Sequence, residues 1–157
     1  MALSIVTPNA NELHDLSKRA GLLLWFRSLT VVPDIVCLQE CHCSSDLECQ
    51  TWFRVSDYLC ALAARSTHAR GCIILFWPTL SLVPSWSEPD GRSLMCEFRF
   101  CNQGFRVCCV YAPNSNPQRN QFLDDVSFSI DPSVPTVLAG DFDRSLDRRG
   151  SDPGCIS

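Results

Sequence analysis

The sequence predicts a single mixed α/β domain in which helices cover sheets that meet in a common core. Three observations lead to this prediction. Strand-like and helix-like segments alternate near both ends, five strand-length runs follow one another in the middle, and no repeat or long linker divides the 157 residues. A chain of this length is large enough to bury a core of its own.

The N-terminal quarter predicts a strand, a helix and a second strand. Residues 3–7 (LSIVT) form a short β-rich run, and residues 34–40 (DIVCLQE) predict a buried strand that ends in Glu40. Between them we expect a helix with Asn11 as its N-cap. Strand, helix, strand in this order predicts a parallel pair joined by a crossover. The apolar face of the expected helix consists of Leu13, Leu16, Ala20, Leu23 and Leu24.

The middle of the chain predicts an antiparallel meander, because its strand-length runs are joined by hairpin-scale turns such as EPDG and CNQG. Residues 114–130 then predict an amphipathic helix with a proline near its first turn. Residues 135–142 (PTVLAGDF) predict a last buried strand. The meander runs cover residues 57–66, 71–77, 80–86, 93–100 and 105–113, and the inner stripe of the helix consists of Phe122, Val126 and Ile130.

Composition is typical of a globular protein, with 46% hydrophobic and 19% charged residues. The net charge is −4 and Lys18 is the only lysine, so no overall positive field attracts polyanions. No apolar stretch approaches the roughly 20 residues needed to cross a bilayer. We therefore expect a soluble protein without a membrane partner.

Eleven cysteines are an odd number, and the first residues lack the features of a secretory signal. This combination predicts reduced thiols, most of them small apolar residues in the core. One dense subset leaves a zinc site open as an alternative, although it lacks a paired C-x₂-C and a second half. The subset consists of Cys37, Cys41, His42, Cys43 and Cys49.

Polar side chains occur at or just after the ends of four predicted strands: Asn9, Glu40, Tyr111 and Asp141. Ligands of α/β sheets bind at this rim of the strands. Carboxylates and amides without a histidine pair favour Mg²⁺, and such a site suits phosphoryl transfer. Arginines at 144, 148 and 149 could hold flanking phosphates, with salt bridges to nearby aspartates as the alternative interpretation.

Four motifs, TPNANEL, CLQECH, VYAPN and AGDF, occur in the order and approximate spacing of the endonuclease/exonuclease/phosphatase superfamily. Over residues 3–152 the chain resembles that superfamily, in particular the endonuclease domain of LINE-type retrotransposons, which is similar to apurinic/apyrimidinic endonucleases. The resemblance implies a four-layer α/β sandwich that nicks DNA with Mg²⁺ or Mn²⁺ and without a small-molecule organic cofactor. A chromosomal DNA substrate would further imply the nucleus.

Transferred by position, the resemblance implies a role for each motif residue. Glu40 resembles the principal metal ligand, and Asp141 resembles the carboxylate that contacts the metal and activates water. Asn9 and Tyr111 resemble the active-site asparagine and the phosphate-contacting tyrosine. Asp143 falls in the catalytic set, whereas Asn11, Asn114, Arg144 and Arg148 fall in the phosphate- and DNA-binding set.

Three departures from the family pattern predict impaired catalysis. Asp143 stands where the family has an asparagine, either as a substitution or as the result of a short deletion, and in both cases adds an anion beside Asp141. Glu12 replaces a glycine that would suit a turn with positive φ. The late Ser-Asp-His segment of the family has no counterpart, so we expect a fold incomplete at its C-terminal end, with a partial domain over 1–152 and an unrelated tail over 153–157.

Two other functions stay open at this point. One is a non-catalytic remnant that binds nucleic acid or protein, although an acidic chain is a poor ligand for DNA phosphates. The other is a different reaction of the superfamily, such as lipid or inositol phosphate hydrolysis.

Overall fold

The structure is a computed structural model that describes residues 2–63, 71–87 and 90–142. The first sheet has the strand order β1-β2-β4-β3, and the second has the order β5-β6-β7-β8. The strands of the first sheet are β1 (Ile5–Val6), β2 (Ile35–Leu38), β3 (Leu59–Ala63) and β4 (Cys72–Phe76). The strands of the second are β5 (Ser81–Ser87), β6 (Ser93–Phe100), β7 (Gln103–Tyr111) and β8 (Thr136–Asp141).

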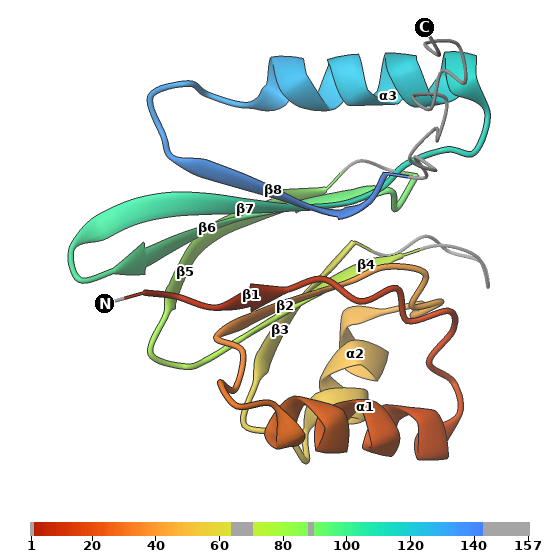
Figure 1. Cartoon of the computed structure of the whole chain (residues 1–157), viewed down its shortest axis with the longest axis vertical. Coiled ribbons are helices and arrows are strands. Elements are labelled where there is room, and N and C mark those ends of the chain that lie inside the picture. The colour runs from red at the N-terminus through yellow and green to blue at the C-terminus, as the bar shows by residue number, and fades with distance from the viewer. Residues whose placement is uncertain (1, 64–70, 88–89, 143–157) are drawn as a thin grey trace, which may run out of the picture.

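The two sheets pack face to face, and helices cover their outer faces (Figure 1). Helices α1 (Leu16–Ser28) and α2 (Asp46–Phe53) lie against the first sheet, and α3 (Asn116–Ser129) lies against the second. This is a four-layer α/β sandwich, as the motif resemblance implies. Among the described residues, no helix is both long and apolar enough to cross a membrane.

Strand β2 shows how the layers are held together. Its four residues are all fully buried, because both faces of the strand are covered. Ile35 and Cys37 pack into the core between the sheets, whereas Val36 and Leu38 pack into the core beneath α1 and α2. A continuous apolar run is the pattern expected of a strand buried on both faces.

The parallel pairing of the first two strands is confirmed, with Ile5 opposite Ile35 and Val6 opposite Val36. The helix between them begins later than the sequence predicted. Its N-cap is Asp15, whose carboxylate accepts a hydrogen bond from the Ser17 N–H at 2.7 Å, so the prediction of Asn11 as the cap is wrong. Residues 9–13 instead run beside residues 39–41.

The predicted apolar face of α1 is also wrong in part, because a different set of residues faces the sheet. Leu16 and Leu24 are 71% and 64% exposed. Phe26 is the buried residue of the helix, with Leu22 and Leu23 packed beside it.

The predicted meander is divided between the two sheets. Strands β3 and β4 form an antiparallel pair in the first sheet, and β5, β6 and β7 form an antiparallel set in the second. The chain changes sheet between β4 and β5. The sequence analysis also missed α2, although Ser45 and Glu48 follow the S-x-x-E spacing of a capping box. The Ser45 side chain accepts a hydrogen bond from the Glu48 N–H at 3.1 Å.

The predicted inner stripe of α3 is confirmed, since Val126 is buried against the second sheet with Phe122 and Ile130 beside it. The prediction of a buried last strand is wrong. Val137 and Leu138 in β8 are 43% and 37% exposed, because β8 pairs only with β7 among the described residues and forms an edge of the sheet. The predicted boundary at residue 152 lies outside the described residues.

Candidate active site at the strand ends

The candidate site lies where strand ends of both sheets come together. Asn9 follows β1 and forms an isolated parallel bridge with Gln39, which directly precedes Glu40. In the second sheet, Asp141 lies opposite Tyr111 at the end of the parallel β7–β8 pair. Both sheets contain one parallel pair, and parallel strands bring their carboxyl ends to the same edge. All four residues predicted at strand ends therefore meet at one place.

Backbone hydrogen bonds position the two loops of the first sheet. The N–H groups of Ala10 and Glu12 donate to the carbonyl oxygens of Gln39 and Glu40 at 2.9 and 2.7 Å. Asn11, Glu12 and Glu40 have φ values of 45°, 73° and 52°, all in the left-handed region. Glu12 therefore occupies the positive-φ turn expected from the family glycine, at a cost of roughly 1–2 kcal/mol.

The amide of Asn9 connects the two carboxylates of the site. Its Nδ2 donates to Glu40 Oε1 at 3.3 Å and to Asp141 Oδ2 at 3.0 Å. Its Oδ1 accepts a hydrogen bond from the Asn11 N–H at 2.9 Å, which orients the amide so that its N–H₂ group faces the carboxylates. Asn11 thus takes part through its backbone, and its side chain is exposed at the rim.

Tyr111 is held as a neutral phenol. Burial raises its pKa to about 12, and a hydrogen bond to Glu40 and the negative charges of Glu40 and Asp141 add to this effect, which Arg92 opposes. The Arg92 guanidinium lies 5.0 Å from the centre of the Tyr111 ring, and its Nη1 donates to the Tyr111 carbonyl oxygen at 3.1 Å. The phenol is therefore a fixed hydrogen-bond donor beside the carboxylates.

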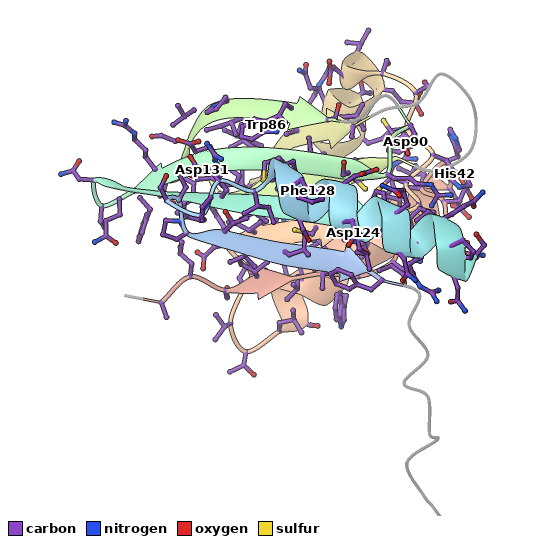
Figure 2. All side chains as sticks on the ribbon, turned by 90° about the horizontal axis from the view of Figure 1, so that it is seen from above. His42, Trp86, Asp90, Asp124, Phe128 and Asp131 are labelled. Carbon is purple, nitrogen blue, oxygen red and sulfur yellow. The ribbon has the colours of Figure 1, made fainter. Side chains whose placement is uncertain are left out.

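A cleft of about 470 Å³ opens beside this site. Glu40, Tyr111 and the predicted residue Asn114 line it, together with His42 and Arg92, which the sequence analysis did not place in the site. The available signals were the position of His42 two residues after Glu40 and that of Arg92 directly before β6. In Figure 2, His42 lies near the end of the molecule at which α3 begins. The predicted residues Asp143, Arg144 and Arg148 lie outside the described residues.

The structure does not gather the cysteine-rich subset into a zinc site. Cys37 packs between the sheets, whereas Cys41, Cys43 and Cys49 pack beneath the helices of the first sheet. No three His, Cys, Asp or Glu residues in the described ranges are arranged to hold a metal. All ten described cysteines are free thiols.

The donor set of the site fits a hard cation. Glu40 and Asp141 supply carboxylate oxygens that the same amide contacts, and within the described part of the chain no thiol or imidazole is bonded to that amide. Mg²⁺ keeps several waters and takes one or two carboxylates together with phosphate oxygens. Two carboxylates beside an open cleft meet that requirement without a third protein ligand.

The fold is a four-layer α/β sandwich with polar residues gathered at its strand ends, and comparison with known proteins shows its family. The chain belongs to the Endonuclease/Exonuclease/phosphatase family, whose model matches residues 7–156. It is 27% identical over 154 residues to the transposon TX1 uncharacterized 149 kDa protein of Xenopus laevis. That match covers 95% of this chain and 12% of the transposon protein.

Two solved structures show the same fold. TDP2 from D. rerio, complexed with single strand DNA product, has a TM-score of 0.67 and 21% identity, covering 91% of this chain and 61% of that one. An AP endonuclease from Archaeoglobus fulgidus has a TM-score of 0.68 and 19% identity, covering 90% of this chain and 57% of that one.

Proposed function

We propose that this chain is a Mg²⁺-dependent phosphodiesterase domain that nicks DNA at the site formed by Asn9, Glu40, Tyr111 and Asp141. The observation that carries the proposal is the Asn9 amide, which hydrogen-bonds to one carboxylate from each sheet, Glu40 and Asp141. Two carboxylates held this close need a shared donor or a cation between them, since like charges repel.

Each residue has a distinct task in the proposed reaction. Glu40 and Asp141 would hold the cation, which when bound polarises the phosphate and stabilises the leaving oxygen. Asp141 accepts a hydrogen bond from the attacking water and orients it toward phosphorus. Asn9 keeps the Asp141 carboxylate in place through the 3.0 Å contact.

Tyr111 supplies a donor for the charge that develops on the non-bridging phosphate oxygens. Because its pKa is raised to about 12, the phenol keeps its proton at neutral pH. The Arg92 guanidinium stacks on the Tyr111 ring and places a positive charge at the cleft. His42 and Asn114 line the same cleft and are available to the sugar-phosphate chain on either side of the cleaved bond.

DNA is the proposed substrate because several independent similarities favour it. The relatives include a transposon protein, an AP endonuclease and a TDP2 bound to single strand DNA product. The chain spans only part of each of these proteins, so DNA as its substrate is a proposal that these similarities favour. Arg144 and Arg148 follow Asp141 closely in the sequence and would contact phosphates that flank the cleaved bond. The same substrate would place the protein in the nucleus.

We further propose that this chain turns over slowly. Asp143 adds an anion two residues from Asp141, where a neutral amide would support the phosphate. Residues of a catalytic unit act together, so an unfavourable charge at one position removes a large share of the rate.

Nicking of supercoiled plasmid tests the proposal. The purified chain is incubated with Mg²⁺ or Mn²⁺, and the variants Glu40→Gln and Asp141→Asn are compared with Asp124→Asn, which removes an exposed carboxylate from α3. We expect slow, metal-dependent nicking that both site variants lose and the α3 variant retains. Nicking that survives in the site variants, or its absence from protein shown to be folded by circular dichroism, would contradict the proposal. A salt-sensitive mobility shift of the same plasmid without nicking would favour the binding remnant.

A further inference from the structure

A second cavity lies farther along α3 than the strand-end cleft, beside residues 122–129 of the helix and not beside its first turn. It is a groove of about 440 Å³ between α3 and the strands β5 and β6. Its lining residues include none of those that line the strand-end cleft. Figure 2 looks down on α3 and shows Trp86 in the strand layer beside the helix, on which Phe128 lies. The groove therefore offers a binding site separate from the proposed phosphodiesterase site.

The floor of the groove is apolar and well packed. Met95 from β6, Cys108 from β7 and Val126 from α3 are each at least 95% buried and belong to one core cluster. Phe122 completes the floor from the helix, and Trp86 at the end of β5 forms a wall. A rigid apolar floor of this size is typical of sites that bind small organic molecules.

The rim of the groove is acidic. Asp90 and Asp125 line it from opposite sides, one before β6 and the other on α3. One carboxylate oxygen of each is held by a neutral donor. The Arg92 backbone N–H donates to Asp90 at 3.0 Å, and Gln121 Nε2 donates to Asp125 at 2.8 Å. These bonds fix the carboxylates without neutralising their charge.

The cation nearest to the wall is already paired. The Arg106 guanidinium lies 5.1 Å from the centre of the Trp86 ring, and its Nε donates to Glu97 Oε2 at 2.9 Å. The Arg106–Glu97 pair stacks on the indole of Trp86. This pair does not neutralise the negative charges of Asp90 and Asp125. The last turn of α3 has no basic residue, and Arg119 in its first turn donates to the Asn114 carbonyl oxygen at 3.3 Å and to the Asn116 side chain.

We propose that this groove binds a small organic cation, an ammonium or guanidinium group on an apolar body. The apolar body lies on Met95, Cys108 and Val126, and the charged group lies between Asp90 and Asp125. The volume of the groove matches a ligand of this class, and the charge of its rim selects a cation over an anion. The same acidic rim repels a phosphate chain, so the groove is not an extension of the proposed DNA site.

A matched pair of probes tests the proposal on the whole chain. Phenethylammonium and 3-phenylpropionate share an aromatic body and carry opposite charges. Each is titrated to 10 mM against ¹⁵N-labelled protein, roughly the concentration range in which ligands of this small size bind. We expect the cation to shift the amide signals of Met95, Cys108 and Val126, and the anion to leave them unchanged.

Neighbouring residues on α3 supply the matched variants. Asp125 lines the groove, whereas Asp124 is exposed and does not line it. We expect Asp125→Asn to weaken binding of the cation about tenfold, as loss of a charged hydrogen-bond partner does. Asp124→Asn should bind like the wild type. Ser129→Phe, which fills the groove from an exposed position on the helix, should abolish binding.

Three results would overturn the proposal: equal binding of the anion, no shift at 10 mM, or undiminished binding by Asp125→Asn. These results are independent of plasmid nicking, because the probes contain no phosphate and the two sites share no lining residue.

Discussion

Asn9 and Asp141 are 132 positions apart in the sequence, and Nδ2 of Asn9 donates a hydrogen bond to Oδ2 of Asp141 at 3.0 Å. This contact joins the first sheet to the second at the proposed active site. It exists because each sheet ends at this edge in a parallel pair, β1 with β2 and β7 with β8. The four predictions below test that geometry and the packing that maintains it.

Substitution of Asn9 should separate its orienting role from a purely structural one. We expect Asn9→Ala to lower the nicking rate about 100-fold, similar to the loss of one preorganised hydrogen-bond donor at other active sites. Asn9→Asp places a third carboxylate beside Glu40 and Asp141. Without Mg²⁺, the melting temperature of Asn9→Asp should therefore be lower than that of Asn9→Ala. Addition of Mg²⁺ should raise the melting temperature of Asn9→Asp more than that of Asn9→Ala. Equal responses of both variants to Mg²⁺ would contradict this electrostatic account.

Alkaline titration should detect the raised pKa of Tyr111. The folded protein holds this proton more tightly than the unfolded chain, whose tyrosine has a pKa near 10.0. The resulting contribution to stability is complete below pH 10 and is lost as the pH rises from 10 toward 12. Absorbance of phenolate at 295 nm reports the ionisation directly.

The chain has two tyrosines, Tyr58 and Tyr111, so Tyr58 is the one tyrosine that still titrates in the Tyr111→Phe variant. The difference between wild type and Tyr111→Phe then isolates Tyr111. A midpoint near 10 for that difference would show that Glu40 and burial do not act on the phenol as the structure indicates.

Gly140 is required by the close approach of β8 to β7. Its φ is 145°, and a Cβ atom there would lie 2.0 Å from the carbonyl oxygen of Val110. We expect Gly140→Ala to lower the free energy of unfolding by about 2–3 kcal/mol, at the upper end of ordinary substitutions, and to reduce nicking by displacing Asp141. Gly104→Ala in β7 is the control, because its Cβ would meet nothing within 4 Å. Chemical denaturation measures both, and equal stability of the two variants would contradict the close approach.

The corrected face of α1 can be tested by truncation of two side chains. Phe26 is 1% exposed and packs beneath the first sheet, so Phe26→Ala should cost about 3–5 kcal/mol. Leu16 belongs to the face that the sequence predicted, yet it is 71% exposed. Leu16→Ala should change stability by less than about 0.5 kcal/mol. A large loss of stability in Leu16→Ala would show that the face predicted from the sequence is the buried one.

Local patterns were sufficient for much of the fold. The strands around Ile35 and Val107, the inner stripe of α3 and the parallel pairing of β1 with β2 follow from apolar runs, helical spacing and element order. The edge position of β8 did not follow, because Val137 and Leu138 are apolar whether or not a further strand covers them. The start of α1 was misplaced because Asn11 and Asp15 are both good N-cap residues, and the pairing of residues 9–13 with 39–41 decided between them.

By itself the sequence determined the mixed α/β class and placed Asn9, Glu40, Tyr111 and Asp141 at strand ends, since strand pattern is a local property of the chain, and the four-layer sandwich was implied by the family resemblance of its motifs. Only the tertiary structure decided that these ends meet and that Asn9 connects the two carboxylates. Only the tertiary structure, too, places Arg92 against the Tyr111 ring and His42 in the cleft, and forms the acidic groove beside α3. These relationships depend on how two sheets pack against each other, and contacts between distant residues leave no periodic signal in the sequence.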